Sequence, residues 1–337
     1  MNIKKLAQKL GLSITTVSRG LGGYSDVSEN TRNRIIKFAN KYNYSPNPNA
    51  SNLASRKTNT LGFVIPLYGL NSNRLNQASF FEFISGMSEK INSEKIQFLM
   101  TFANTIAEEK EAYKRLIDVQ KVDKIILHNL KKNDSRIKLL QDNNINFVGW
   151  GRTQGKINYP WVDLDNEGSV DLIMHYLFEK NHRKIAFINV NEKYNFAFQR
   201  KQGYVKFLKQ KKIKINKNYY VTVDGEDPEL NSAEIKKLIE KNSKLTAIIC
   251  SSEYSAAGAI KALNELNLKI GKDISLITFD GSVVNSISSP SITAVTHDRK
   301  QLGQKAIELL TAKKRSKINN YLAKPKIIER GSVHKVI

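Results

Sequence analysis

Short polar side chains and one arginine gather on a single predicted helix near the start of the chain. Residues 14–21 read ITTVSRGL, and Val17 and Leu21 have the spacing of an inward face. An outward face of this kind suits the major groove of DNA: an arginine can bind guanine through two hydrogen bonds, a threonine methyl can contact thymine, and hydroxyl groups can bind phosphates. On spacing alone, an ordinary helical hairpin with a solvated face fits equally well. The outward-facing residues are Ile14, Thr15, Thr16, Ser18 and Arg19.

Two more predicted helices would position this one. An apolar stripe before it ends at Gly11, which suits a helix C-cap, and Ser13 can cap the next helix. A third helix is expected from Ser28 to about Tyr42, again with a serine as its N-cap. Together these segments predict a three-helix miniature core.

Positive charge is concentrated in the same part of the chain. The first 60 residues hold ten Lys and Arg against two acidic residues, a net charge of +8, while the rest of the 337-residue chain carries the remaining +15 of a total of +23. Such a balance favours polyanionic partners. The chain is also rich in Lys, Asn and Ile, so compositional bias is an alternative source of part of the charge.

A proline-containing linker follows. Pro46 and Pro48 stop the third helix, and residues 49–56 could form about two helical turns, which are marginal by themselves. A flexible linker fits this segment as well.

From residue 60 onward, apolar runs alternate with helical patterns. This alternation predicts parallel sheets covered by helices on both faces, in two similar subdomains with a ligand cleft between them at the carboxyl ends of the strands. The runs lie at 60–66, 96–102, 122–127 and 145–150, and then at 184–190, 219–223, 245–251 and 274–280.

Motifs for catalysis and for metal binding are missing from the sequence. The segment GRTQGK at 151–156 has the wrong glycine spacing for a phosphate loop. His175 and His182 lack the spacing of metal ligands, and the carboxylates Asp163 and Asp165 have no accompanying general acid. We therefore expect no catalytic residue, no metal site and no cofactor.

The sequence shows no signal for a membrane or for secretion. No apolar run approaches the roughly 18–20 residues of a membrane helix, and the first residues lack the apolar segment of a secretory signal. We expect a cytoplasmic protein without a membrane partner.

Three motifs stand in order within residues 3–47: LA…GLS…TTVSR.L, VS..TR..I and YNYSPN. With these motifs the segment resembles the DNA-binding headpiece of the LacI/GalR (lactose/galactose-repressor) family of bacterial transcriptional regulators. The resemblance implies an N-terminal all-α helix-turn-helix headpiece (1–45) and a hinge helix or linker (46–58). It further implies an α/β periplasmic-binding-protein-like core (59–337) of two doubly wound parallel-sheet subdomains.

The same resemblance implies a homodimeric transcription regulator, a repressor of carbohydrate-utilisation genes that binds double-stranded operator DNA. By resemblance Ile14, Thr15 and Arg19 read bases, although Ile14 replaces a residue that is often polar. The implied hinge contacts are Ala50, against the partner hinge, and Leu53, as a minor-groove wedge. The remaining implied DNA-binding positions are Thr16, Ser18, Ser28, Thr31, Arg32 and Asn47.

The resemblance also implies a small-molecule effector site. Arg200 would bind ligand hydroxyl groups and Asp280 would accept hydrogen bonds opposite it, while Ser252 stands where the family often has asparagine. Charged groups beside aromatic faces suit a sugar, and the segments around Trp150 and 289–304 resemble the subgroup that responds to α-galactosides and α-glucosides. The other implied effector-binding residues are Phe80, Phe81, Trp150, Arg152 and His297; an Arg152–Asp163 ion pair and a core position for Phe81 are the structural alternatives.

The family's fold would divide the core into a subdomain of residues 59–160 plus 291–323 and a second of residues 161–290 plus 324–337. Two other functions remain open from the sequence: a sugar-binding receptor of a transport system, and an enzyme on a doubly wound α/β fold. The missing leader and the added headpiece argue against the first, and the missing catalytic motifs argue against the second.

Overall fold

The computed structural model describes residues 1–44, 58–68, 78–223, 227–281, 283–312 and 320–337. These residues form two compact units, one of residues 1–58 and one of residues 59–337. Each unit is described by itself below.

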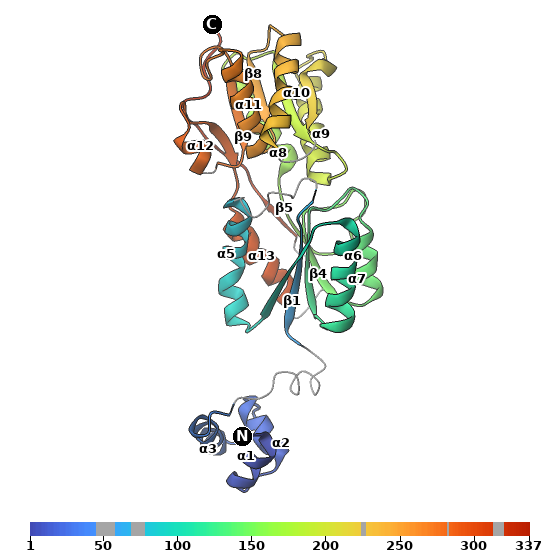
Figure 1. The fold of residues 1–337 in the computed structure, drawn as a ribbon, viewed down its shortest axis with the longest axis vertical. Coiled ribbons are helices and arrows are strands. Elements are labelled where there is room, and N and C mark those ends of the chain that lie inside the picture. The colour runs from blue at the N-terminus through green and yellow to red at the C-terminus, as the bar shows by residue number, and fades with distance from the viewer. Residues whose placement is uncertain (45–57, 69–77, 224–226, 282, 313–319) are drawn as a thin grey trace. The chain divides into compact units, whose positions relative to one another are not determined.

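The first unit is a three-helix headpiece (Figure 1). Its helices are α1 (Ile3–Leu10), α2 (Ile14–Leu21) and α3 (Glu29–Lys41). The side chains of Ser13 and Ser28 accept hydrogen bonds from backbone amides of the first turns of α2 and α3, and Gly11 ends α1 in the left-handed conformation with φ of +63°. The predicted caps are therefore confirmed, and they satisfy backbone groups that a short helix leaves unpaired.

A small apolar core holds the three helices together. Val17 of α2 is fully buried, and Leu21 packs against the cluster while partly exposed. Because the helices are short, this burial and not helix propensity holds the headpiece together. The buried members are Leu6, Ala7, Leu10, Val17, Val27, Ile35 and Ala39.

The second unit contains two six-stranded sheets (Figure 1). The first sheet is entirely parallel, in the order β11-β5-β4-β3-β1-β2. With its helices it is called the first lobe. Its strands are β1 (Thr60–Pro66), β2 (Gln97–Ala103), β3 (Lys124–His128), β4 (Asn146–Trp150), β5 (Trp161–Leu164) and β11 (Tyr321–Ala323).

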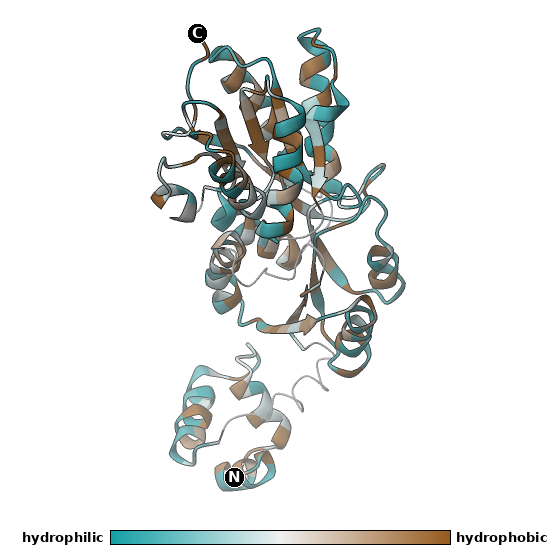
Figure 2. Ribbon diagram, turned by 45° about the horizontal axis from the view of Figure 1, so that its top comes forward, coloured by the Kyte–Doolittle hydropathy of each residue, from teal (hydrophilic) through white to brown (hydrophobic). Residues whose placement is uncertain are grey.

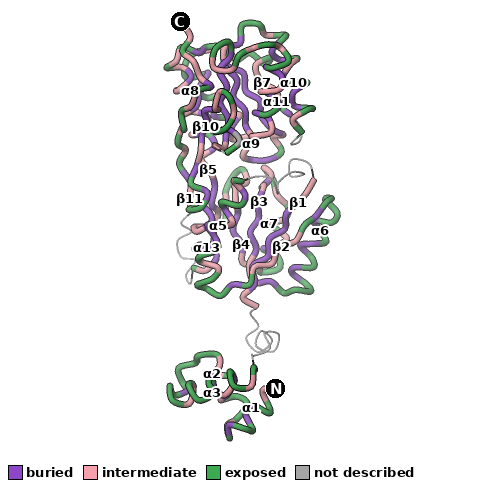
Figure 3. Tube along the Cα trace, turned by 60° about the vertical axis from the view of Figure 1, so that its left-hand side comes forward, coloured by how far each residue is buried: buried purple, intermediate pink, exposed green. Residues whose placement is uncertain are grey.

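Helices cover both faces of the first sheet. One face packs against α5 (Ala78–Ser93) and α13 (Arg299–Thr311), and the other packs against α6 (Ile106–Lys114), a π-helical turn (Arg115–Val119) and α7 (Ser135–Asp142). The inner strands β1 and β3 are therefore buried, as Figure 3 shows in purple, whereas the edge strand β2 is largely exposed or half-buried. Brown ribbon on the strands in Figure 2 marks their apolar residues.

The second sheet has the order β12-β10-β9-β8-β6-β7 and, with its helices, forms the second lobe. It is parallel except that β12 runs antiparallel to β10. Its strands are β6 (Ile185–Val190), β7 (Tyr220–Val223), β8 (Ala247–Cys250), β9 (Ser275–Phe279), β10 (Thr293–Thr296) and β12 (Lys326–Ile328). Its helices are α8 (Asn166–Glu179) and α9 (Asn195–Gln210) on one face, α10 (Pro228–Lys241) and α11 (Glu253–Glu265) on the other, a 3₁₀ turn (Lys217–Tyr219) and α12 (Val283–Ile287).

Two strand assignments from the sequence are wrong. β5, at 161–164, was expected in the second subdomain, but it pairs with β4 and β11 in the first sheet. Residues 291–295 were expected in the first subdomain, but β10 pairs with β9 and β12 in the second sheet. An apolar run fits either parallel sheet, so periodicity cannot decide which neighbour a strand finds.

The lobes are joined where the chain crosses between the two sheets. The crossings follow β5, β10 and β11, and the second of them leads directly into α13. α13 is fixed to the first lobe by close packing on α5, because a Cβ atom at Gly303 would overlap the backbone carbonyl of Phe83.

Among the described residues, no helix is both long enough and apolar enough to cross a lipid bilayer.

Candidate nucleic-acid interface and ligand cleft

The outer face of α2 carries the side chains that the sequence predicted to face outward. Ile14, Thr15 and Ser18 are exposed, Ile14 by 44 %, whereas Thr16 and Arg19 are half-buried. An exposed isoleucine beside small hydroxyl side chains gives the helix a narrow face, which suits close approach to base edges.

Arg19 is held by the loop that follows α2. Its Nε lies 2.6 Å from Oδ2 of Asp26, and its guanidinium lies 4.6 Å from the ring centroid of Tyr24. The close contact between the two opposite charges raises the pKa of Arg19 and lowers that of Asp26, so both groups are charged at neutral pH.

Several predicted phosphate contacts also have a structural task. The hydroxyl of Thr16 lies 2.8 Å from that of Ser13, and Ser28 donates to the hydroxyl of Thr31 at 2.9 Å. Arg32 donates from Nη2 to the carbonyl oxygen of Tyr24 at 2.8 Å. Asn47, Ala50 and Leu53 lie outside the described residues.

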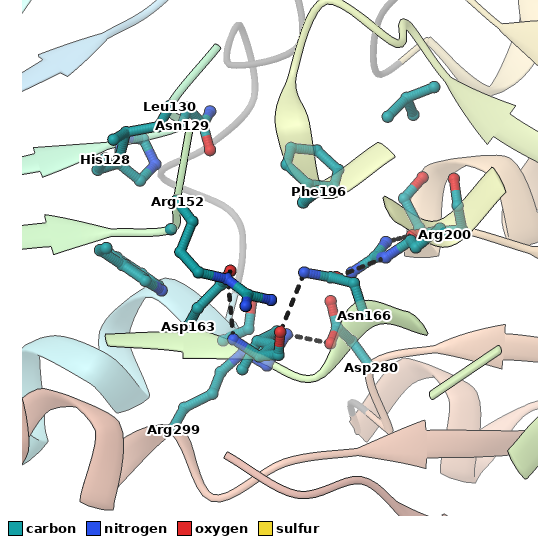
Figure 4. Close-up of a pocket in the computed structure, with 17 residues that line it drawn as sticks. His128, Asn129, Leu130, Arg152, Asp163, Asn166, Phe196, Arg200, Asp280 and Arg299 are labelled. Atoms are coloured by element: carbon teal, nitrogen blue, oxygen red, sulfur yellow. Dashed lines mark hydrogen bonds and ion pairs between the residues drawn. The ribbon is translucent and has the colours of Figure 1, made fainter. Parts of the chain in front are cut away.

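A cleft between the two lobes contains five of the predicted effector-binding residues (Figure 4). It encloses about 940 Å³ of unfilled space, part of it open to solvent. The five residues are Trp150, Arg152, Arg200, Ser252 and Asp280.

Backbone hydrogen bonds join the lobes at one side of this cleft. The amide of Lys132 donates to the carbonyl of Lys193, and the amide of Asn195 donates to the carbonyl of Leu130, both at 3.0 Å. These bonds hold the lobes together directly beside the lining residues.

Arg200 is the most deeply buried cation of the cleft, with 5 % of its surface exposed. Nε donates to Oδ1 of Asn166 at 3.0 Å and Nη1 donates to the carbonyl of Ser251 at 2.7 Å, while the guanidinium lies 3.8 Å from the ring centroid of Phe279. Burial lowers the pKa of Arg200 to about 10, which leaves it charged at neutral pH. Its bonds therefore fix the side chain through neutral acceptors.

Asp280 lines the same cleft as Arg200, and its ion-pair partner is Arg299. The Nη2 of Arg299, the first residue of α13, forms an ion pair with Oδ1 of Asp280, which follows β9. Asp280 adopts φ of +68°, an uncommon conformation for a residue other than glycine. Because α13 belongs to the first lobe and β9 to the second, this ion pair connects the lobes.

Arg152 and Asp163 form a second ion pair, within the first lobe. Nε of Arg152 donates to Oδ2 of Asp163 at 2.8 Å, and the guanidinium lies 4.7 Å from the ring centroid of Trp161. Burial raises the pKa of Asp163, and Arg152 opposes that shift. The structural alternative expected for Arg152 is thus confirmed, although both side chains also line the cleft.

Trp150 supplies an aromatic surface to the cleft. Its ring stacks on that of Phe83 with a centroid separation of 3.7 Å and an angle of 10°. Phe80 lies in the core of the first lobe, and Phe81 is 51 % exposed on α5, so neither lines the cleft.

His297 also lies outside the lining, at the crossing between β10 and α13. Its Nε2 is 2.9 Å from the hydroxyl of Ser169, and 6 % of its surface is exposed. Burial, and then the positive charges of Arg299 and Arg200, lower its pKa to about 3. This histidine is therefore neutral under ordinary conditions and supports the crossing.

Comparison with known proteins now places the chain. Residues 2–47 match the family model described as bacterial regulatory proteins, lacI family, and residues 174–333 match the periplasmic binding protein-like domain. The chain is 34 % identical over 282 residues to the HTH-type transcriptional regulator AglR of Rhizobium meliloti (strain 1021). The matched residues make up 83 % of this chain and 78 % of that protein. The chain belongs to the lacI family of bacterial regulatory proteins.

Solved structures agree with this fold. The lac repressor dimer bound to operator and the anti-inducer ONPF matches with a TM-score of 0.81 at 20 % identity, over 99 % of both chains. The complex of the regulator CelR with cellobiose matches with a TM-score of 0.74 at 21 % identity, over 98 % of this chain and 99 % of that one. The predicted family, the predicted fold and the function as a DNA-binding transcriptional regulator are confirmed.

Sequence reasoning missed several residues that line the cleft of this lacI-family regulator. Asp163 was expected as a possible ion-pair partner of Arg152 but not as a residue that lines the cleft, and its place at the end of a strand was the available signal. Nothing in the sequence marked Arg299, which looks like an ordinary first residue of a helix. The missed lining residues include Asn129, Asp163, Asn166, Phe196, Ser251 and Arg299.

Proposed function

We propose that this regulator is a homodimeric repressor of carbohydrate-utilisation genes, and that a sugar bound in the cleft sets its affinity for operator DNA. The observation that carries the proposal is the cleft itself, where three arginines and two carboxylates surround an aromatic surface. Vicinal hydroxyl groups can accept from guanidinium donors and donate to carboxylates, and the apolar face of a pyranose can lie against Trp150.

An α-galactoside or an α-glucoside is the effector class we propose. The segments around Trp150 and around Arg299 support this class through their resemblance to that subgroup, and CelR offers a neighbour of the same fold that was solved with a disaccharide. Arg200, Asp280 and Ser252 would contact the ligand, with Arg152 and Trp150 on the other side.

DNA recognition is proposed for the outer face of α2. Ile14, Thr15 and Arg19 would contact base edges in the major groove. Hydroxyl groups at the starts of α2 and α3, those of Thr16, Ser28 and Thr31, can also bind phosphates. Ser18 and Arg32 are the other two proposed phosphate contacts. In the hinge we propose Asn47, Ala50 and Leu53.

Exposed apolar side chains on the second unit support a homodimer. Met100, Phe102 and Ile106, on and after the edge strand β2, are 38 %, 45 % and 68 % exposed, and Val283 and Ile287 of α12 are 70 % and 76 % exposed. Exposed apolar groups of this kind mark surfaces that bury themselves against a partner. A two-fold dimer would place two headpieces on a pseudo-palindromic operator in the cytoplasm.

The proposed control uses the same cleft. A ligand that binds one arrangement of the lobes better than the other shifts the population toward it, by no more than its difference in affinity for the two. Three chain crossings and the Arg299–Asp280 ion pair connect the lobes, so a ligand that contacts both lobes can change their relation and thereby the spacing of the two hinges.

Calorimetric titration of the full-length protein with melibiose, raffinose, maltose and sucrose tests the effector class. We expect at least one of these sugars to bind, and Arg200→Gln to weaken that binding at least tenfold. Binding of a purine or an amino acid, with no heat from any of the four sugars, would refute the proposal.

A further inference from the structure

Arg19 is not a free side chain at the end of α2. The carboxylate of Asp26 binds its Nε at 2.6 Å, and the ring of Tyr24 lies 4.6 Å from its guanidinium carbon. Neither Asp26 nor Tyr24 is among the residues proposed above to contact DNA. Both nevertheless contact Arg19, which is the charged residue among the three proposed to read bases.

The loop that carries these two residues is itself fixed. Gly23 has φ of +74°, and the amide of Tyr24 donates to the carbonyl of Arg19 at 3.1 Å, so the chain folds back on the end of α2. Arg32 of α3 donates from Nη2 to the carbonyl of Tyr24 at 2.8 Å and to that of Val27 at 3.3 Å. Since Val27 is buried with 6 % exposure, the loop is anchored at both ends.

The contact with Nε has a geometric consequence. A guanidinium group carries five N–H donors in a planar fork, and a carboxylate at Nε leaves the two terminal amino groups available on the far edge. That edge is the one that can bind O6 and N7 of a guanine in the major groove. Holding the side chain before DNA arrives also removes rotamer freedom that would otherwise be lost on binding.

We propose that Asp26 and Tyr24 are positioning residues that hold Arg19 with its terminal amino groups directed at a guanine. This inference rests on the proposed entry of α2 into the major groove. It explains why a strongly basic segment keeps an acidic side chain on its DNA-facing side: residues 1–60 contain only two acids, Asp26 and Glu29.

Glu29 provides a matched control. It is exposed in the first turn of α3 and carries the same charge as Asp26 within the same headpiece. Replacing either acid by its amide removes one negative charge near the phosphates. Both variants should therefore bind all DNA somewhat more tightly, and only a positioning role distinguishes them.

The experiment uses the full-length protein and a half-site obtained by selection from random-sequence DNA. Equilibrium affinities are measured for the selected duplex and for single base-pair substitutions, with wild type, Arg19→Ala, Asp26→Asn, Glu29→Gln and the Arg19→Ala/Asp26→Asn double variant. The base pair at which Arg19→Ala removes the preference is the one that Arg19 reads. There we expect wild type to discriminate roughly 5- to 150-fold.

We expect Asp26→Asn to lower the discrimination at that base pair about threefold to tenfold, and to leave it unchanged elsewhere. Glu29→Gln should leave it unchanged everywhere, and Asp26→Asn should have no effect on discrimination in the Arg19→Ala background. Tyr24→Leu should lower discrimination at the same base pair, whereas Tyr24→Phe, which keeps the ring, should not.

Two results would overturn the inference. Unchanged discrimination in Asp26→Asn, or an equal loss in Glu29→Gln, would show that Asp26 acts only through its charge. If instead Arg19→Ala removes no base preference at all, the proposed role of α2 itself fails, so the two failures can be distinguished.

Discussion

At the residue scale, the cleft depends on which charges are paired. Arg299 pairs with Asp280 and Arg152 pairs with Asp163, whereas Arg200 is held by the neutral oxygens of Asn166 and Ser251. A side chain already fixed by neutral partners can offer its remaining donors to a ligand without first breaking an ion pair. Arg200 is for this reason the residue on which effector affinity should depend most.

Removing one member of the Arg299–Asp280 pair should destabilise the protein more than removing both. Side-chain exposure is 7 % for Arg299 and 22 % for Asp280, so Arg299→Met leaves a poorly solvated carboxylate without its partner. We expect that variant to lose about 1–3 kcal/mol of unfolding free energy, and the double variant with Asp280→Asn to recover part of it. Urea unfolding of the four proteins measures the coupling; strictly additive effects would contradict it.

His297 should make stability depend on mildly acidic pH. Its folded pKa of about 3 lies below the ordinary value of 6.5, so below pH 6.5 the unfolded chain takes up a proton that the folded one does not. Stability should therefore fall as the pH drops from about 6.5 toward 3, by about 2 kcal/mol at pH 5 from this group.

The matched variant for this effect is His297→Gln, which can still hydrogen-bond to Ser169 but does not titrate. Urea midpoints at pH 7, 6 and 5 should fall less steeply for the variant. Some slope should remain, because burial also lowers the pKa of His182 to about 4. Equal slopes for both proteins would show that His297 does not titrate as described.

A residue of the cleft could be predicted from the sequence when a local motif marks it, and not when its role depends on a contact with a distant part of the chain. Arg200 and Asp280 sit in local motifs that resemble the family's, so both were placed in the cleft before the fold was seen. The partner of Asp280 was missed because Arg299 comes from another lobe, and no local pattern records a contact across two sheets. Phe80 was wrongly expected in the cleft because an aromatic residue early in a helix can face the core as readily as the cleft.

At the element scale, the position of α13 determines the cleft. The helix packs on α5 in the first lobe and places its first residue, Arg299, against the second lobe. Gly303 permits this packing, because only hydrogen fits against the carbonyl of Phe83.

Gly303→Ala should therefore push the two helices apart. We expect a loss of about 1–3 kcal/mol of unfolding free energy from overpacking, together with weaker effector binding because Arg299 moves with the helix. Ser85→Ala, at an exposed position of α5, is the control and should change neither quantity. Thermal melts and sugar titration of both variants give the two readouts; an unchanged melting temperature in Gly303→Ala would contradict the close packing.

Most elements could be predicted because their patterns are local. The run TLGFVIP is β1 from its first residue to its last, and the serine caps start α2 and α3 where expected. β5 and β10 were assigned to the wrong sheets because pairing is a long-range property, and β5 was hard to recognise since it has four residues and no helix before it.

At the scale of the whole molecule, two separate units divide the work. The headpiece carries a net charge of +8 in the first 60 residues and a narrow face of small side chains, which together favour DNA. The second unit holds a cleft that two lobes share, and a ligand there can act on DNA binding only if it favours one arrangement of the lobes over another.

The central claim is that occupancy of the cleft changes operator affinity, and an operator titration with and without sugar measures this directly. The full-length protein is titrated onto a fragment of its own upstream region at fixed salt, without sugar and with whichever of melibiose, raffinose, maltose or sucrose binds. The same two titrations are repeated with the Arg200→Gln variant. We predict that the sugar changes the Kd for the operator at least fivefold in wild type and leaves it unchanged in the variant. A sugar that binds wild type without changing its operator Kd, or that changes the Kd of Arg200→Gln equally, would contradict the account.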